Sequence, residues 1–149
     1  AHSLVVQYGL YPKLDVYMTR KARSIELGKF HFQPYVDYLS NYVSTSVVNN
    51  YDILGVATLA NIDLNRAKTN IAELRLKQTY KVGDSFDCPA FNGLYDFCQL
   101  SAGGSIDCAR TIIYGEADVA INWGGGLHHA KKCEASGFCY INDIVLCIL

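Results

Sequence analysis

Two adjacent histidines, His128 and His129, are the residues best suited to acid–base chemistry in this sequence. They follow three glycines, residues 124–126, which let the backbone adopt positive φ angles and approach a ligand closely. Two imidazoles beside one reacting centre can have different pKa values if their carboxylate partners differ, so that one accepts a proton while the other donates one or stabilises charge. The residues alone leave a second interpretation open, in which both are loop histidines satisfied by backbone groups.

The spacing of the pair argues against joint metal chelation, because adjacent residues do not share a helix face as an i, i+4 pair does. The glycine run matches neither G-x-G-x-x-G nor the phosphate-binding P-loop. Glu134 and Asp143 follow the histidines but fit no ligand pattern, and we interpret Asp143 as a charge favoured by the dipole at a helix N-terminus. The spacing therefore favours a division of proton-transfer roles over joint metal binding, and the interpretation as loop histidines stays open beside it.

The segments on either side of this loop predict the elements that position it. Residues 117–123 are almost continuously apolar, which predicts a buried strand, and Asn142 is a suitable cap for a final helix. Ligands of open α/β sheets bind beyond the carboxyl ends of strands, which is where the histidines fall. A helical pattern runs from Asn92 to Gly115 and is interrupted by two glycines, Gly103 and Gly104. Adjacent glycines inside a helix predict close packing or a kink at that point.

The N-terminal half has a weaker pattern. It predicts a helix ending at Gly9, a strand over residues 14–18, a helix from Ser24 and another with Pro34 in its first turn. Further along, residues 44–81 are polar and Asn-rich at first, and a helical period follows from Ile62 to Leu74. Helices alternating with strands predict an α/β fold with a mainly parallel sheet.

Composition limits the classes of function. The 149 residues are 50% hydrophobic and 18% charged, as in one globular domain, and 13 basic residues against 14 acidic ones exclude a clamp that neutralises many phosphates. No apolar run reaches the roughly 18 to 20 residues that span a bilayer, and no secretion signal opens the chain, so we expect an intracellular protein. The six cysteines form no C-x-x-C pair, and we expect most to be buried thiols.

Three sequence blocks carry a resemblance to a known family. The run over residues 121–143, which contains the glycines and both histidines, resembles the signature of class I histone deacetylases. Residues 87–101 resemble a second block of that family, and residues 8–11 a third, in the family order. The resemblance implies an arginase/deacetylase-like α/β fold, with a mainly parallel sheet and helices on both faces.

The resemblance also implies that residues 1–149 are only the N-terminal portion of a deacetylase domain. Residues 44–81 match the family poorly, which indicates a possible insertion. The chain begins without methionine and ends on an apolar run, residues 144–149, with no helix stop signal. We therefore expect a fragment.

Roles for individual residues follow from the resemblance. His129 is expected to be the general base that activates a zinc-bound water for attack on the acetyl-lysine carbonyl, with His128 as its electrostatic or acid partner. Gly137 and Phe138 are expected to form a wall of the tunnel for the acylated lysine, since an aromatic face suits its aliphatic stem. Asp87 is expected on the rim, accepting N–H groups of the substrate peptide, although a turn-forming Asp before Cys-Pro fits equally well.

The resemblance implies Zn2+ for the full-length protein. Its ligands, two aspartates and a histidine, and the tyrosine that polarises the carbonyl are expected beyond residue 149, so the fragment alone is expected to be inactive. The implied substrates are acetylated histone tails or other acetyl-lysine proteins, and the implied partners are corepressor complex subunits, without direct contact to nucleic acid or membrane. We expect transcriptional repression in the nucleus, with the cytoplasm as a second location.

Two other hypotheses remain open at this stage. A truncated, non-catalytic chain would act at most as a corepressor-type binding module. A deacetylase of polyamines or other small amides would keep the fold and the zinc but change the substrate.

Overall fold

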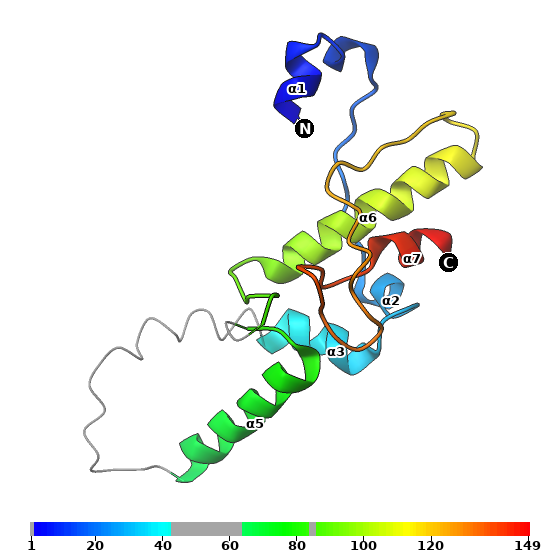
Figure 1. Ribbon diagram of the computed structural model, residues 1–149. Helices are drawn as coiled ribbons and strands as arrows, with labels where there is room; N and C mark the ends of the chain where they lie inside the picture. Colours follow the sequence, from blue (N-terminus) through cyan, green and yellow to red (C-terminus); the bar gives the residue numbers. More distant parts are fainter. Residues whose placement is uncertain (1, 43–63, 84–85) are drawn as a thin grey trace.

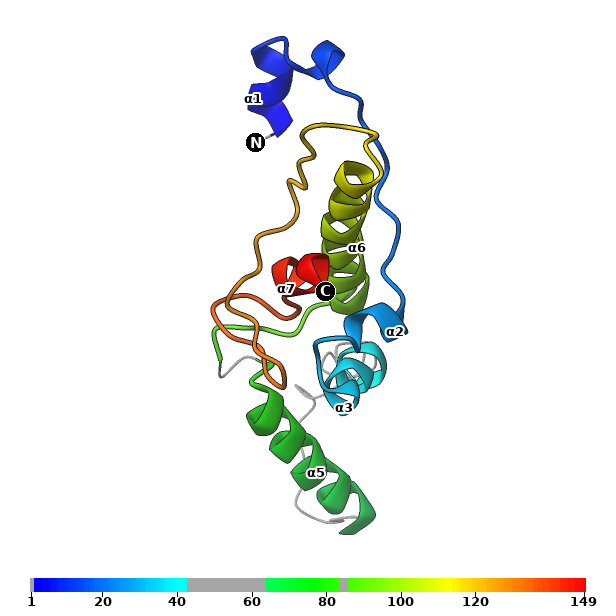
Figure 2. The same ribbon diagram turned by 90° about the vertical axis from the view of Figure 1, so that its right-hand side faces the viewer.

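The computed structural model describes residues 2–42, 64–83 and 86–149 (Figure 1). The fold is elongated, with the long helix α6 in its middle, α1 at one end and α5 at the other (Figures 1 and 2). The helices are α1 (His2–Gln7), α2 (Ser24–Leu27), α3 (Gln33–Asp37), α5 (Leu64–Tyr80), α6 (Leu94–Ile113) and α7 (Asp143–Ile148), with a 3-10 turn at Tyr11–Lys13 and a π-helical turn at Tyr38–Tyr42. Predictions for residues 43–63 lie outside the described residues.

The two predicted strands are absent from the described chain. Residues 14–18 and 117–123 are irregular, and the only ladder contact in the described ranges is one bridge between Ser136 and Cys139. Both segments border an open groove over α6 instead of pairing with each other. A strand needs hydrogen bonds to a neighbouring strand, so neither segment can form one by itself. The prediction of strands there is wrong, and the parallel sheet stays a prediction.

The segment before the histidines is also more exposed than its apolar sequence indicated. The side chains of Val119 and Ile121 are 74% and 55% exposed, because no second layer covers them in the described chain. A near-continuous apolar run predicts a buried strand only when other elements cover both faces of its sheet.

The helix predictions are confirmed where the chain is described. Pro34 lies in the first turn of α3, and α7 begins after Asn142, whose side-chain oxygen accepts the N–H of Val145 at 3.1 Å. α6 continues through Gly103 and Gly104, so only the prediction of close packing holds. A Cβ atom on Gly103 would collide with the Arg20 carbonyl, and one on Gly104 would lie 2.8 Å from the Asn122 side chain.

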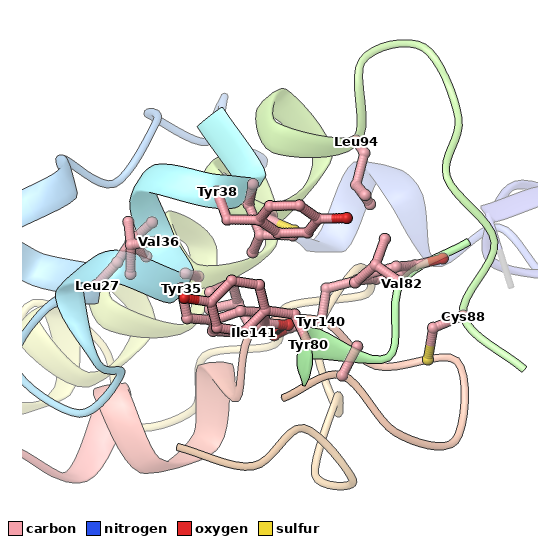
Figure 3. Packing of buried hydrophobic residues seen from close by; sticks show 14 of the residues in the cluster. Leu27, Tyr35, Val36, Tyr38, Tyr80, Val82, Cys88, Leu94, Tyr140 and Ile141 are labelled. Atoms are coloured by element: carbon pink, nitrogen blue, oxygen red, sulfur yellow. Dashed lines mark hydrogen bonds between the residues drawn. The ribbon is translucent and has the colours of Figure 1, made fainter. Parts of the chain in front are cut away.

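An aromatic cluster forms the core that connects these elements. Figure 3 shows side chains from α3, the end of α5 and residues 140–141 lying together. The ring of Tyr80, the last residue of α5, lies 5.3 Å from that of Tyr35 and 4.8 Å from that of Tyr38. Tyr35 is fully buried, and its hydroxyl donates to the carbonyl of Tyr140 at 2.8 Å. This bond ties α3 to the chain that leads into α7.

The Tyr35 hydroxyl offers a test of this core. Tyr35→Phe should lower the free energy of unfolding by about 1 to 3 kcal/mol, because it removes a buried donor and leaves the Tyr140 carbonyl without it. Urea denaturation of the protein expressed from its complete coding sequence measures the change. Tyr17→Phe is the matched control, because Tyr17 is 82% exposed and should change little. Equal effects of the two substitutions would contradict the assignment.

Candidate active site at the histidine loop

The segment of residues 124–132, called here the histidine loop, presents both predicted histidines at its surface. The Nε2 atoms of His128 and His129 lie 3.0 Å apart, and the ring centroids are 4.2 Å apart. At this distance one Nε2 carries a proton and donates it to the lone pair of the other. The arrangement can therefore pass a proton between the two rings. Both side chains are exposed and reach the solvent from which a substrate would arrive.

The start of the histidine loop is attached to α6. The Ser101 hydroxyl donates to the carbonyl of Gly124 at 2.6 Å. The Asn122 amide donates to the Ser101 carbonyl and to the Ser105 hydroxyl, both at 2.9 Å. The chain thus enters the loop in a direction set by one face of α6.

Two of the other predicted site residues, Asp87 and Gly137, are connected to the histidine loop. The N–H of Gly137 donates to a carboxylate oxygen of Asp87 at 2.9 Å. A Cβ atom on Gly137, whose φ angle is +52°, would lie 2.8 Å from the ring of His129, so only glycine permits this approach. The structure brings Asp87, Gly137, His128 and His129 into one site.

Phe138 completes the predicted set and points outward. Its side chain is 72% exposed, and its φ angle of +62° is uncommon for a bulky residue. Two backbone bonds between Ser136 and Cys139, of 2.9 and 2.8 Å, close the turn that holds Phe138 in this conformation. The turn therefore presents an exposed aromatic side chain on the residue after Gly137, whose backbone lies against the His129 ring.

Sequence reasoning missed a third histidine that supports the loop. His31 is only 2% exposed; its Nε2 accepts the N–H of Asn142 at 3.0 Å, and its Nδ1 lies 3.3 Å from the carbonyl of Lys132. The Nδ1–H tautomer satisfies both contacts. Burial lowers the pKa of His31 to about 4, so the ring is neutral at pH 7. No local pattern distinguishes this residue, because both partners lie about a hundred positions away.

Cys88, the neighbour of Asp87, is not an activated nucleophile. All six cysteines are free in the structure; Cys88, Cys98 and Cys139 are buried, Cys108 and Cys147 are partly buried and Cys133 is exposed, so half of the cysteines rather than most are buried thiols. Burial, followed by the neighbouring Asp87 carboxylate, raises the pKa of the Cys88 thiol to about 11. The thiol is therefore protonated at neutral pH, and a protonated thiol is a weak nucleophile.

A metal centre needs several ligating side chains around one point. Within the described ranges, no group of three His, Cys, Asp or Glu side chains is arranged to hold a metal ion. The zinc that the resemblance implies for the full-length protein stays an expectation, because its ligands are expected beyond residue 149. In the same part of the chain, no helix is both long and apolar enough to cross a bilayer.

Comparison with known proteins identifies the family. A family model described as histone deacetylase domain matches residues 1–149. The chain belongs to the histone deacetylase family. Relatives include type-1 histone deacetylase 1 of Dictyostelium discoideum, 45% identical over 99% of this chain, histone deacetylase RPD3 of Saccharomyces cerevisiae, 42% identical over 100%, and human histone deacetylase 1, 40% identical over 99%. The chain spans 25%, 29% and 26% of the length of these three deacetylases, respectively.

The neutral His31 predicts a pH dependence of stability. Its pKa falls from 6.5 to about 4 on folding, so its stabilising contribution is complete above pH 6.5 and is lost as the pH falls towards 4. The loss should amount to about 3 kcal/mol, because one pKa unit corresponds to about 1.4 kcal/mol. Urea denaturation between pH 7 and pH 4 measures it.

The control for this prediction is His31→Gln, which keeps a donor and an acceptor but cannot titrate. Its unfolding free energy should change less between pH 7 and pH 4 than that of the unsubstituted protein. Parallel pH curves for the two proteins would show that His31 is not the titrating group.

Proposed function

We propose that this protein hydrolyses the acetyl-lysine amide of histone tails or other acetylated proteins, and that the histidine loop carries its proton-transfer residues. The observation that carries the proposal is the 3.0 Å contact between the Nε2 atoms of His128 and His129, beside Gly137 and Phe138. Membership of the histone deacetylase family supports the reaction class. Through this activity the protein regulates chromatin in the nucleus. Its partners there are subunits of corepressor complexes.

The two histidines divide the proton transfer. His129 takes a proton from the water that attacks the acetyl carbonyl carbon, and His128, which shares a hydrogen bond with it, stabilises the resulting imidazolium. The C–N bond then breaks, and the imidazolium returns the proton to the lysine nitrogen, giving acetate and free lysine. Because the zinc ligands are expected beyond residue 149, we assign only proton transfer and substrate binding to residues 1–149.

Substrate binding falls to three neighbouring residues. The exposed ring of Phe138 supplies an apolar wall for the aliphatic stem of the acetyl-lysine, and Gly137 keeps the wall against His129. One oxygen of Asp87 accepts the Gly137 N–H, and among the described residues its other oxygen has a long contact of 3.6 Å with the Cys88 sulfur. That oxygen is suited to accept an N–H of the substrate peptide. The net charge of −1 supports recognition of protein rather than nucleic acid.

Substitution of the histidines tests the proposal. His129→Ala should lower kcat for an acetyl-lysine peptide by about 10²- to 10⁴-fold, the usual contribution of a general base. His128→Ala should lower kcat by a smaller factor, because it acts through its partner ring. His2→Ala is the control, because His2 is an exposed histidine on α1 that contacts only Tyr11 among the described rings.

The outcome separates two functions. A protein that is inactive with every acetyl-lysine peptide and still assembles with corepressor subunits would be a binding module rather than an enzyme. Normal activity of His129→Ala would contradict the assigned base.

The Phe138 side chain tests the binding half of the proposal. Phe138→Ala should raise KM for an acetyl-lysine peptide by about 10-fold, because the loss of an aromatic contact costs on the order of 1 to 2 kcal/mol, while kcat changes less. Steady-state kinetics gives both constants. Tyr114→Ala is the matched control, since Tyr114 is 69% exposed at the end of α6. A fall in kcat alone would place Phe138 outside the substrate-binding surface.

A further inference from the structure

We infer that Asn142 and Asp143, at the start of α7, are positioning residues that hold the histidine loop by its backbone and so set the contact between His128 and His129. The inference deepens the proposed function and rests on it for the catalytic consequence. Its structural part can be measured without substrate.

Asp143 holds the loop just before the histidines. The residue is 1% exposed, and its two carboxylate oxygens accept the N–H of Gly126 at 3.0 Å and the N–H of Leu127 at 2.8 Å. The Ser105 hydroxyl of α6 donates to the same carboxylate. A Cβ atom on Gly125 would lie 2.5 Å from it, so the loop backbone lies directly against this side chain. Asp143 therefore fixes the two peptide groups that lead into His128.

Asn142 holds the loop on both sides of His129. Its amide nitrogen donates to the carbonyl of His128 at 3.1 Å and to that of Ala130 at 3.0 Å. An amide nitrogen has two protons, and both are used on the loop. The side-chain oxygen accepts the N–H of Val145 and caps α7. One residue thus fixes the helix start and the two carbonyls that flank His129.

These contacts exceed what helix capping requires. Capping of α7 requires only the side-chain oxygen of Asn142. A favourable interaction of Asp143 with the helix dipole requires only that its charge lies near the N-terminus of the helix. Here both side chains reach out of the helix to successive peptide groups of one loop, from Gly126 to Ala130. A displacement of about 1 Å in such groups can cost about 100-fold in rate. The geometry therefore assigns them a positioning role in addition to a capping role.

Two isosteric substitutions separate the roles. Asn142→Asp keeps the oxygen that caps α7 but turns an acceptor towards the carbonyls of His128 and Ala130. Asp143→Asn keeps the shape of the side chain but replaces one acceptor oxygen by an NH2 group. In one orientation this NH2 group faces the N–H of Leu127, and in the other it faces the N–H of Gly126 and the Ser105 hydroxyl, so it always meets a donor. Each change leaves the side-chain volume almost unaltered and reverses the contacts to the loop.

The measurement uses the protein expressed from its complete coding sequence with 15N-labelled histidine. In the unsubstituted protein, the imidazole spectrum should show a 15N–15N coupling across the hydrogen bond between His128 and His129. Asn142→Asp and Asp143→Asn should lose this coupling and lower kcat for an acetyl-lysine peptide by about 10- to 100-fold, with KM within about 2-fold. Retention of both the coupling and kcat in the two variants would overturn the inference.

Two further variants keep the test decisive. Thr79→Ala removes a side-chain hydrogen bond on α5, to the carbonyl of Arg75, and should leave the coupling and kcat unchanged. If the isosteric variants do not fold, Asn142→Ser keeps a cap residue and removes both donations to the loop, and it should also lose the coupling. Retention of the coupling in Asn142→Ser would count against the inference.

The two proposals fail differently. An unsubstituted protein that shows the coupling but cleaves no acetyl-lysine peptide would contradict the proposed function, while loss of the coupling in the variants would still support the positioning role. An active protein whose variants keep both the coupling and kcat would contradict the positioning role alone.

Discussion

The buried start of α7 is the constraint on which the rest of this structure depends. A carboxylate as buried as that of Asp143 is costly unless its oxygens accept hydrogen bonds, and backbone N–H groups of a tight loop also cost free energy when left without partners. The loop from Gly126 to Ala130 and the first residues of α7 satisfy each other, and no buried side-chain nitrogen or oxygen in the described residues lacks a partner. The histidine loop therefore has little freedom to adopt another conformation.

Close backbone packing makes this arrangement possible. At Gly104, Gly125 and Gly137 a Cβ atom would lie within 2.5 to 2.8 Å of a side chain of the site network, namely those of Asn122, Asp143 and His129. The lack of a side chain at these three glycines is therefore as important for the site as its polar side chains. Glycine weakens a helix interior, as at Gly104 in α6, so its use there is explained by the close approach of the segment that leads into the loop.

The sequence predicts the local features of this chain better than the distant ones. Pro34 and Asn142 mark helix starts because a helix boundary depends on neighbouring residues, whereas residues 117–123 were wrongly predicted as a strand because a strand depends on a partner far along the chain. The histidine pair could be found from its residue types and its resemblance to a family. The role of His31 could not, since its contacts to Lys132 and Asn142 span 101 and 111 positions.

Those long-range contacts connect the aromatic core to the chemistry. α3 and the turn before it reach the chain around α7 at two points, through His31 to the N–H of Asn142 and through the Tyr35 hydroxyl to the carbonyl of Tyr140. Both contacts lie just before the residues that hold the histidine loop. A shift of α3 would therefore move the start of α7, and with it the peptide groups on both sides of His129. It follows that the aromatic core contributes to the geometry of the site as well as to stability.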